Sequence, residues 1–286
     1  MTELNQTRCV LRFRCPDQPG ILARLAPLLT ENGWDIREAT IYGDPGTATF
    51  FVRMELASGS ARVADLAGHI APAVAALGLD WEVHDIAQPM PVLIAVSKFN
   101  HCLVDLLHKV EIGALPIRIV CVVSNHEQER KRVEWHGIPY HHLPVDRSDK
   151  AAQERRFLEI IEESGAELTV LARYMQILSD DFAGQLDGRC INIHHSFLPS
   201  FKGAKPYHQA KARGVKLIGA TAHYVTADLD EGPIIEQDVR RVSHATTAEE
   251  MVAIGREVEA SVLSRAVRWH SEHRILGNGN QTVVLN

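Results

Sequence analysis

Residues 117–123 read IRIVCVV, an apolar run with a single arginine, and similar runs occur at 92–97 (VLIAVS) and 168–172 (LTVLA). Near-continuous apolar strands are typical of parallel sheets covered on both faces, whereas a strand with one solvated face alternates polar and apolar residues. Segments with helical periodicity separate these runs, at 101–111, 126–137 and 150–165. This alternation predicts a doubly wound, mostly parallel, Rossmann-like α/β domain over residues 92–286.

The rest of that domain follows the same order. We expect further strands at 190–194, 217–226 and 233–242, a helix near 206–214, and a long helix from about residue 247 to 272.

Residues 6–86 form a second pattern, in the order strand, helix, strand, strand, helix, strand. The residues CPDQPGILARLAPLLTENGWDI resemble the ACT domain, a ferredoxin-like βαββαβ module. This resemblance implies an amino-acid effector at the turn that contains Asp17 and Gly20. A role in dimerisation alone stays equally open. AQPMP at 87–91 is interpreted as the linker between the two domains.

Composition and charge exclude several classes of protein. The 286 residues are 45% hydrophobic and 23% charged and contain no apolar run that could span a bilayer, so no membrane helix is predicted. The formal net charge of −6, with Lys and Arg spread along the chain, argues against a large nucleic-acid surface. The N-terminus lacks the apolar core of a signal peptide, and we therefore expect a cytoplasmic protein.

The predicted strand CINIH at 190–194 ends with two polar side chains on one face. Residues two apart in a strand share a face, so Asn192 and His194 project together, whereas His195 is expected on the opposite side. In open α/β sheets, ligands bind beyond the carboxyl ends of the strands, where both residues lie. Downstream, the turn in VTADLDEGPII contains Asp230.

These three side chains predict transfer of an acyl or formyl group by direct attack. Asn192 can donate an N–H to an oxygen that becomes negative in a tetrahedral intermediate. His194 can exchange a proton with a leaving nitrogen or an attacking water. Asp230 either stabilises the imidazolium or helps to deprotonate water, and the sequence leaves both roles open.

Other nucleophiles and metals are not expected. Cys190 lies about 13 Å from His194 along the strand, far beyond the reach of a nucleophile and its base. Cys102, near a helix N-terminus, is the better thiol candidate, and we expect it to serve in packing or pocket lining. The five cysteines form no C-x-x-C pair, so free thiols are predicted. We expect no metal and no cofactor.

Three segments resemble the 10-formyltetrahydrofolate-dependent formyltransferase fold, over about residues 92–280. They are NIHHSFLPSFKGAKPYHQA, GATAHYVTADLDEGPIIEQDV and LARYMQILS. The resemblance implies that Asn192, His194 and Asp230 form the catalytic set. It also implies a folate pocket in which the side chains of Met175, Ile177 and Leu178 contact the pterin region of the folate.

Differences from two related families argue against two possible acceptors of the formyl group. Glycinamide ribonucleotide transformylase has small residues in the turn after its first strand, where this chain has Lys98, Phe99 and His101, so a phosphoribosyl acceptor is disfavoured. Methionyl-tRNA formyltransferase has a C-terminal barrel and a basic surface, for which this acidic chain leaves no room.

An ACT-like module ahead of such a domain most closely resembles the formyltetrahydrofolate deformylase family. This implies that water attacks the formyl carbon of 10-formyltetrahydrofolate, giving tetrahydrofolate and formate for purine synthesis. We expect a homo-oligomer, a dimer or a tetramer, without nucleic-acid or membrane partners. A formyltransferase with an amine acceptor, and a folate- or amino-acid-binding regulator without turnover, remain as alternatives.

Overall fold

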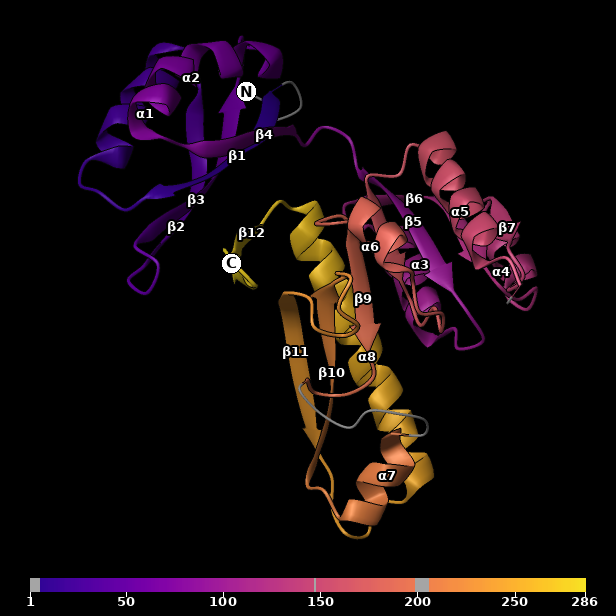
Figure 1. Cartoon of the computed structure of the whole chain (residues 1–286). Helices are drawn as coiled ribbons and strands as arrows, with labels where there is room; N and C mark the ends of the chain where they lie inside the picture. Colours follow the sequence, from indigo (N-terminus) through magenta and orange to yellow (C-terminus); the bar gives the residue numbers. More distant parts are fainter. Residues whose placement is uncertain (1–5, 147, 199–205) are drawn as a thin grey trace. The chain divides into compact units, whose positions relative to one another are not determined.

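A computed structural model describes residues 6–146, 148–198 and 206–286, and Figure 1 shows its helices and strands. Residues 199–205, which belong to the first formyltransferase motif, lie outside the described residues. The chain divides into two compact units, one of Met1–Pro89 with Glu272–Asn286 and one of Met90–Ser271. No helix in the described ranges is long and apolar enough to cross a membrane.

The first unit contains a four-stranded antiparallel sheet in the order β2-β3-β1-β4. Its elements are β1 (Thr7–Pro16), α1 (Ile21–Glu31), β2 (Asp35–Asp44), β3 (Thr49–Ser58), α2 (Val63–Leu77) and β4 (Asp80–Asp85). Both helices pack on one face, where Leu25 and Ile70 meet Leu11 and Phe13 in a buried core. The predicted ferredoxin-like βαββαβ arrangement is confirmed.

The C-terminal residues form a hairpin that belongs to the first unit. β12 (Ile275–Asn278) and β13 (Gln281–Val284) pair in antiparallel fashion. Leu276 and Leu285 pack against Phe51 of β3 and bury apolar surface outside the core that α1 and α2 cover. Burial of this surface explains why the hairpin leaves the second unit.

Two boundaries predicted from the sequence are therefore corrected. The range 92–286 was predicted to form one domain, but the second unit ends at Ser271. The linker was predicted at 87–91, but β5 already begins at Met90, and its pairing with β6 includes Pro91. Proline is tolerated at the start of a strand, so its presence did not mark the linker.

The second unit contains a seven-stranded sheet in the order β11-β10-β9-β8-β5-β6-β7. The strands are β5 (Met90–Val96), β6 (Ile117–Ser124), β7 (Tyr140–His142), β8 (Leu168–Leu171), β9 (Cys190–His194), β10 (Leu217–Tyr224) and β11 (Ile234–Arg241). β9, β8, β5, β6 and β7 are parallel, whereas β10 runs antiparallel to β9 and β11 runs antiparallel to β10. The predicted mostly parallel sheet is confirmed.

Helices cover both faces of this sheet, as doubly wound folds require. α5 (Lys150–Ser164) and α6 (Asp180–Gln185) pack on one face through Phe157 and Phe182. α3 (His101–Glu111) and α8 (Ala248–Ser271) contact each other and cover the other face, where α8 runs along β9, β10 and β11 (Figure 1). The short helix α4 (Arg130–Trp135) leads into β7.

A glycine in α8 admits an aromatic ring from α7 (Pro206–Arg213). A Cβ at Gly255 would lie 2.1 Å from Tyr207 Oη and 2.2 Å from its Cζ, so only glycine leaves room for this ring. Tyr207 Oη donates a hydrogen bond of 2.7 Å to Glu259 Oε1, one turn further along α8. Glycine inside a helix costs about 1 kcal/mol relative to alanine, and the packing of the ring offsets this cost.

Gly255→Ala should lower the free energy of unfolding by about 1–3 kcal/mol, because the new methyl group collides with a buried ring. Gly184→Ala in α6 is the matched control, since no atom lies within 4 Å of its added Cβ. The control should be neutral or slightly stabilising. Urea unfolding of both variants measures the difference, and equal stabilities would contradict the packing argument.

Candidate active site

The three predicted catalytic residues meet at the carboxyl end of β9. His194 Nδ1 lies 3.2 Å from Asp230 Oδ1, and both side chains are largely buried. Asn192 Nδ2 lies 3.2 Å from His223 Nε2, which in turn lies 3.7 Å from Asp230 Oδ1. The site therefore contains four interacting side chains, and the sequence analysis named three of them.

Hydrogen-bond partners determine where the protons of both imidazoles lie. Asp230 as a carboxylate can only accept, so the proton of neutral His194 lies on Nδ1 and leaves Nε2 for the substrate. In the described residues, His194 Nε2 is buried and has no hydrogen-bond partner. His223 Nδ1 lies 2.8 Å from the carbonyl oxygen of Tyr224, to which it donates. Neutral His223 thus presents an Nε2 lone pair to the Asn192 amide.

The turn between β10 and β11 positions Asp230. Asp230 has a positive φ of 59°, a left-handed conformation that Asp and Asn tolerate better than most residues. A Cβ at Gly232 would lie 1.8 Å from the carbonyl oxygen of Tyr224, so the turn returns tightly against β10. The hydrogen bond of His194 is the largest cause of the lowered pKa of Asp230, which stays ionised.

Two side chains of the site, His223 and Thr221, come from β10. Register pairs Thr221 with His194 and His223 with Asn192, so all four lie on one face of two neighbouring strands. Thr221 Oγ1 donates to the carbonyl of Ser196 at 3.0 Å and accepts from the N–H of Leu198 at 3.1 Å, which fixes the loop after β9. The alternation in LIGATAHYVT indicates that Thr221 and His223 share one face of the strand. The register with which this strand pairs with β9 could not be inferred from the sequence.

His195 does not point away from His194, contrary to expectation. The two rings stack, with centroids 4.8 Å apart and planes inclined by 24°. β9 ends at His194, so strand alternation no longer applies to the next residue. Burial lowers the pKa of His195 to about 4, with Arg173 as the next cause.

A buried carboxylate joins three segments beside His195. Glu259 of α8 accepts from His101 Nε2 at 2.8 Å and from Tyr207 Oη at 2.7 Å, and Arg173 Nε lies 3.3 Å away. These partners lower the pKa of Glu259 against the opposing effect of burial. The charge is compensated, as a buried charge must be.

Cys102 lies next to this cluster and is fully buried. Burial and the charge of Glu259 raise its thiol pKa, so the helix N-terminus does not activate it. Burial likewise raises the pKa of Cys190. All five cysteines are free and buried, as predicted.

One ligand atom each of His101, Cys102 and Glu259 lies within 4.8 Å of the others, but Glu259 is already engaged by His101 and Tyr207. The expectation of no metal stays a prediction.

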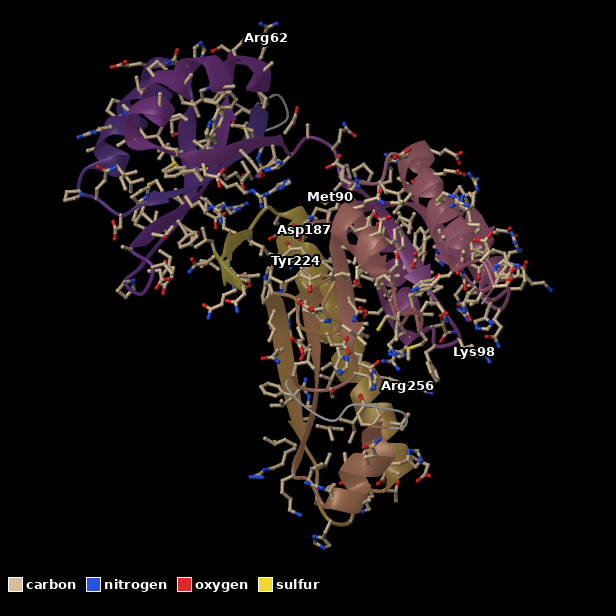
Figure 2. The ribbon with its side chains drawn as sticks, in the orientation of Figure 1. Arg62, Met90, Lys98, Asp187, Tyr224 and Arg256 are labelled. Atoms are coloured by element: carbon tan, nitrogen blue, oxygen red, sulfur yellow. The ribbon has the colours of Figure 1, made fainter. Side chains whose placement is uncertain are left out.

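The turn after β5 departs from a phosphate-binding loop. Two guanidinium groups lie near the ring of Phe99, with Arg173 Cζ 5.5 Å and Arg256 Cζ 5.8 Å from its ring centroid. Lys98 and Arg256 are labelled in Figure 2. Side chains therefore occupy the turn where backbone N–H groups would have to approach a phosphate.

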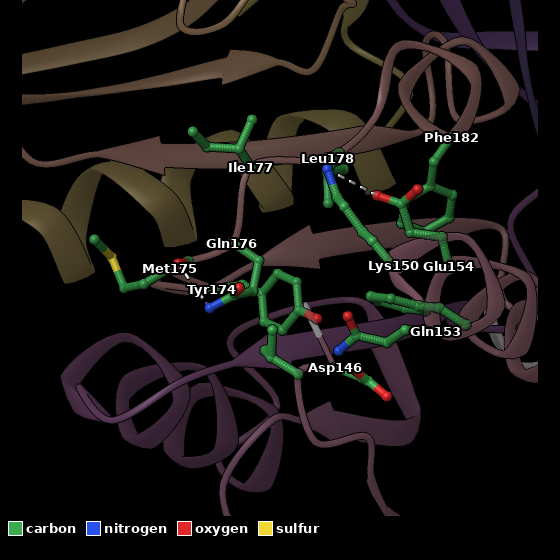
Figure 3. A pocket seen from close by; sticks show the side chains of 12 residues that line it. Asp146, Lys150, Gln153, Glu154, Tyr174, Met175, Gln176, Ile177, Leu178 and Phe182 are labelled. Atoms are coloured by element: carbon green, nitrogen blue, oxygen red, sulfur yellow. Dashed lines mark hydrogen bonds and ion pairs between the residues drawn. The ribbon is translucent and has the colours of Figure 1, made fainter. Parts of the chain in front are cut away.

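The predicted folate segment lines a cavity of about 380 Å³ on the face covered by α5 and α6. Met175, Ile177 and Leu178 all contribute to its lining, together with Lys150, Glu154, Tyr174 and Phe182. In Figure 3, Met175 and Phe182 lie at opposite ends of the view, and a dashed line joins Lys150 to Glu154. Because β8 and β9 are parallel neighbours, the loop that follows β8 lies beside the end of β9.

The predicted effector residues lie in the first unit. Asp17 and Gly20 are exposed in the turn between β1 and α1. Gly20 has a φ of 85°, a conformation that glycine adopts without steric cost. Effector binding at this turn stays a prediction.

Comparisons with known proteins agree with this geometry. The family model "Formyl transferase" matches residues 90–267. Formyltetrahydrofolate deformylase of Corynebacterium sp. (strain P-1) is 49% identical over 282 residues, which cover 98% of this chain and 99% of that protein. The crystal structure of formyltetrahydrofolate deformylase from Burkholderia mallei has a TM-score of 0.93 at 48% identity and covers 98% of this chain and 100% of that one.

A more distant structure matches part of the chain. Glycinamide ribonucleotide transformylase 1 from Symbiobacterium toebii has a TM-score of 0.64 at 28% identity and covers 69% of this chain and 94% of that one.

Asp230→Asn should reduce stability in a pH-dependent manner. The folded-state pKa of Asp230 is lowered, so its ionised form adds stability above the unfolded pKa of about 4, and this contribution is lost as pH falls through the folded value. The stability difference between wild type and variant should be full at pH 7 and shrink below pH about 4. Asparagine also tolerates the positive φ. Urea unfolding at pH 7, 5 and 3 measures this trend, and a constant difference would contradict it.

Proposed function

This chain belongs to the formyltetrahydrofolate deformylase family of formyl transferases, and from this membership we propose how its residues release formate. It hydrolyses 10-formyltetrahydrofolate to formate and tetrahydrofolate. The observation that carries the residue assignment is the contact of 3.2 Å between His194 and Asp230, beside Asn192 at the end of β9.

Asn192 stabilises the oxyanion in this mechanism. When water attacks the formyl carbon, the carbonyl oxygen becomes negative and needs a donor that is already oriented. One N–H of Asn192 Nδ2 faces the His223 lone pair at 3.2 Å, which leaves the second N–H of the same nitrogen for this oxygen. His223 is thus a positioning residue for the amide.

His194 protonates the leaving nitrogen N10. The nearby carboxylate of Asp230 favours the imidazolium, from which Nε2–H can be transferred as the bond between carbon and N10 breaks. The lowered pKa of Asp230 makes it a stabiliser of this cation rather than a base. Of the two roles that the sequence left open, we therefore propose the stabilising one.

Folate would bind along the loop that follows β8. Met175 and Ile177 are 51% and 63% exposed beside the cavity, and apolar residues exposed together at a groove are typical of a ligand-binding surface. Asn192 and His194 lie on the same face of the sheet as α5 and α6. Cys190, two and four residues before them on β9, shares their face and packs in that core. This shared face supports a substrate that spans the cavity and His194.

Several wider features are proposals of the same kind. We infer a cytoplasmic homo-oligomer that needs no metal or cofactor and supplies formate for purine synthesis. Hydrolysis by Asn192, His194 and Asp230 requires no redox or electrophilic group, which supports the absence of a cofactor. An amino acid that binds at the turn of Asp17 and Gly20 would regulate the enzyme, and the likeness of the first unit to a ferredoxin-like module supports this proposal.

The purified protein should convert 10-formyltetrahydrofolate to equal amounts of formate and tetrahydrofolate without an added acceptor. His194→Ala and Asp230→Ala should each lower kcat by at least ~100-fold, because the acid or its charge partner is lost. Asp228→Ala is the matched control, since this carboxylate is exposed and two residues from Asp230. Its kcat should stay near that of wild type.

Two outcomes would contradict this proposal. Formyl release that depends on an added amine would make the protein a transferase. Near-normal rates for His194→Ala, with wild-type melting temperature, would remove the assigned acid.

A further inference from the structure

His195 is held rigidly at the catalytic centre. Its ring stacks on His194 with centroids 4.8 Å apart, although it follows the last residue of β9. The backbone directly after it is fixed, because Thr221 Oγ1 bonds to both the carbonyl of Ser196 and the N–H of Leu198. A ring whose backbone and neighbour are both fixed keeps a defined place beside the reacting atoms.

Burial and nearby positive charges favour the neutral ring of His195. Burial is the largest cause of its lowered pKa, and the charges of Arg173 and His194 act in the same direction. Glu259 and Asp230 oppose them without reversing the shift. At neutral pH, the ring therefore offers one nitrogen lone pair and can accept a proton.

The catalytic residues assigned above contain no base for the attacking water. Asn192 only donates to the oxyanion, and His194 in its imidazolium form is the acid for N10. Asp230 Oδ1 is engaged by His194 at 3.2 Å, and its lowered pKa makes it a weak base. Another group near His194 must therefore accept the proton that the attacking water loses.

We propose that His195 binds the attacking water and takes its proton. This inference rests on the proposed hydrolysis. The water oxygen bonds to the formyl carbon, one water proton moves to His195, and the carbonyl electron pair moves onto the oxygen that Asn192 holds. The bond from carbon to N10 then breaks, and its electron pair receives the proton of His194 Nε2.

The two stacked rings make this sequence electrically consistent. His195 becomes positive when water attacks, and His194 loses its proton when N10 leaves, so the stack carries one positive charge before the attack and one after N10 has left. In the tetrahedral intermediate between these steps, the oxyanion held by Asn192 offsets the second positive charge. The product formic acid releases a proton to solvent as formate. The proton on His195 then returns to His194, which restores both rings for the next turnover.

His195→Ala and His195→Gln should distinguish this role from a structural one. Both should lower hydrolysis by about 100-fold, since neither side chain is a base at neutral pH. Hydroxylamine attacks as a neutral amine and needs no base before its bond forms. With hydroxylamine added, formation of the hydroxamate should fall less than about 5-fold, so the ratio of hydroxamate to formate should rise at least ~20-fold.

His141→Ala is the matched control. His141 lies on β7, and burial lowers its pKa as well, so the same change is made to a similar ring away from β9. Its product ratio should equal that of wild type.

Three results would overturn the inference. They are an equal loss of both products, an unchanged hydrolysis rate, and failure of both His195 variants to fold, which would make His195 a structural residue. A wild-type protein that releases no formate without an amine would instead refute the proposed hydrolysis.

Discussion

The hydrogen bond between His194 and Asp230 determines how the rest of the site can work. A carboxylate accepts but cannot donate, so it keeps a proton on Nδ1 and directs Nε2 toward the substrate. The pair is largely buried, where such an interaction is stronger than in water. Without this partner, the ring of His194 would lack a defined orientation.

Two constrained backbone positions, at Asp230 and Gly232, make this contact possible. Asp230 adopts a left-handed conformation, and Gly232 lies so close to the carbonyl of Tyr224 that no side chain fits there. β10 thereby fixes the positions of both His194 and Asp230, because it pairs with β9 at His194 and supports the turn that contains Asp230. The strand that positions the acid also positions its carboxylate, and a shift in the register of β10 would move both.

Sequence periodicity could predict some of these features and not others. The alternation in β9 placed Asn192 and His194 on one face, and the apolar runs predicted the parallel strands. Asp230 was assigned through a family turn, because no local pattern shows that it reaches His194. His223 and Thr221 were missed, since their role depends on the register between β9 and β10. His195 was placed wrongly because strand alternation stops where the strand ends.

Other features could not be predicted from the sequence because they depend on packing between residues that are far apart along the chain. The hairpin of β12 and β13 has strands of four residues, too short for a periodic signal, and its place follows from apolar burial on β3. α6 and β7 were also missed, as elements of six and three residues. Glu259 did leave a signal, a single acid on the apolar face of α8 with Val258 and Val262 also buried.

The cluster around Glu259 links the architecture to the charge of the site. His101 follows β5, Arg173 follows β8 and Tyr207 lies on α7, so one carboxylate connects three segments at the carboxyl edge of the sheet. Removing one member of a buried ionic group leaves the others uncompensated, which makes such a cluster hard to alter in parts. Arg173 also contributes to the lowered pKa of His195. Arg173 therefore both holds the loop after β8 to the buried carboxylate and favours the neutral form of the ring that stacks on His194.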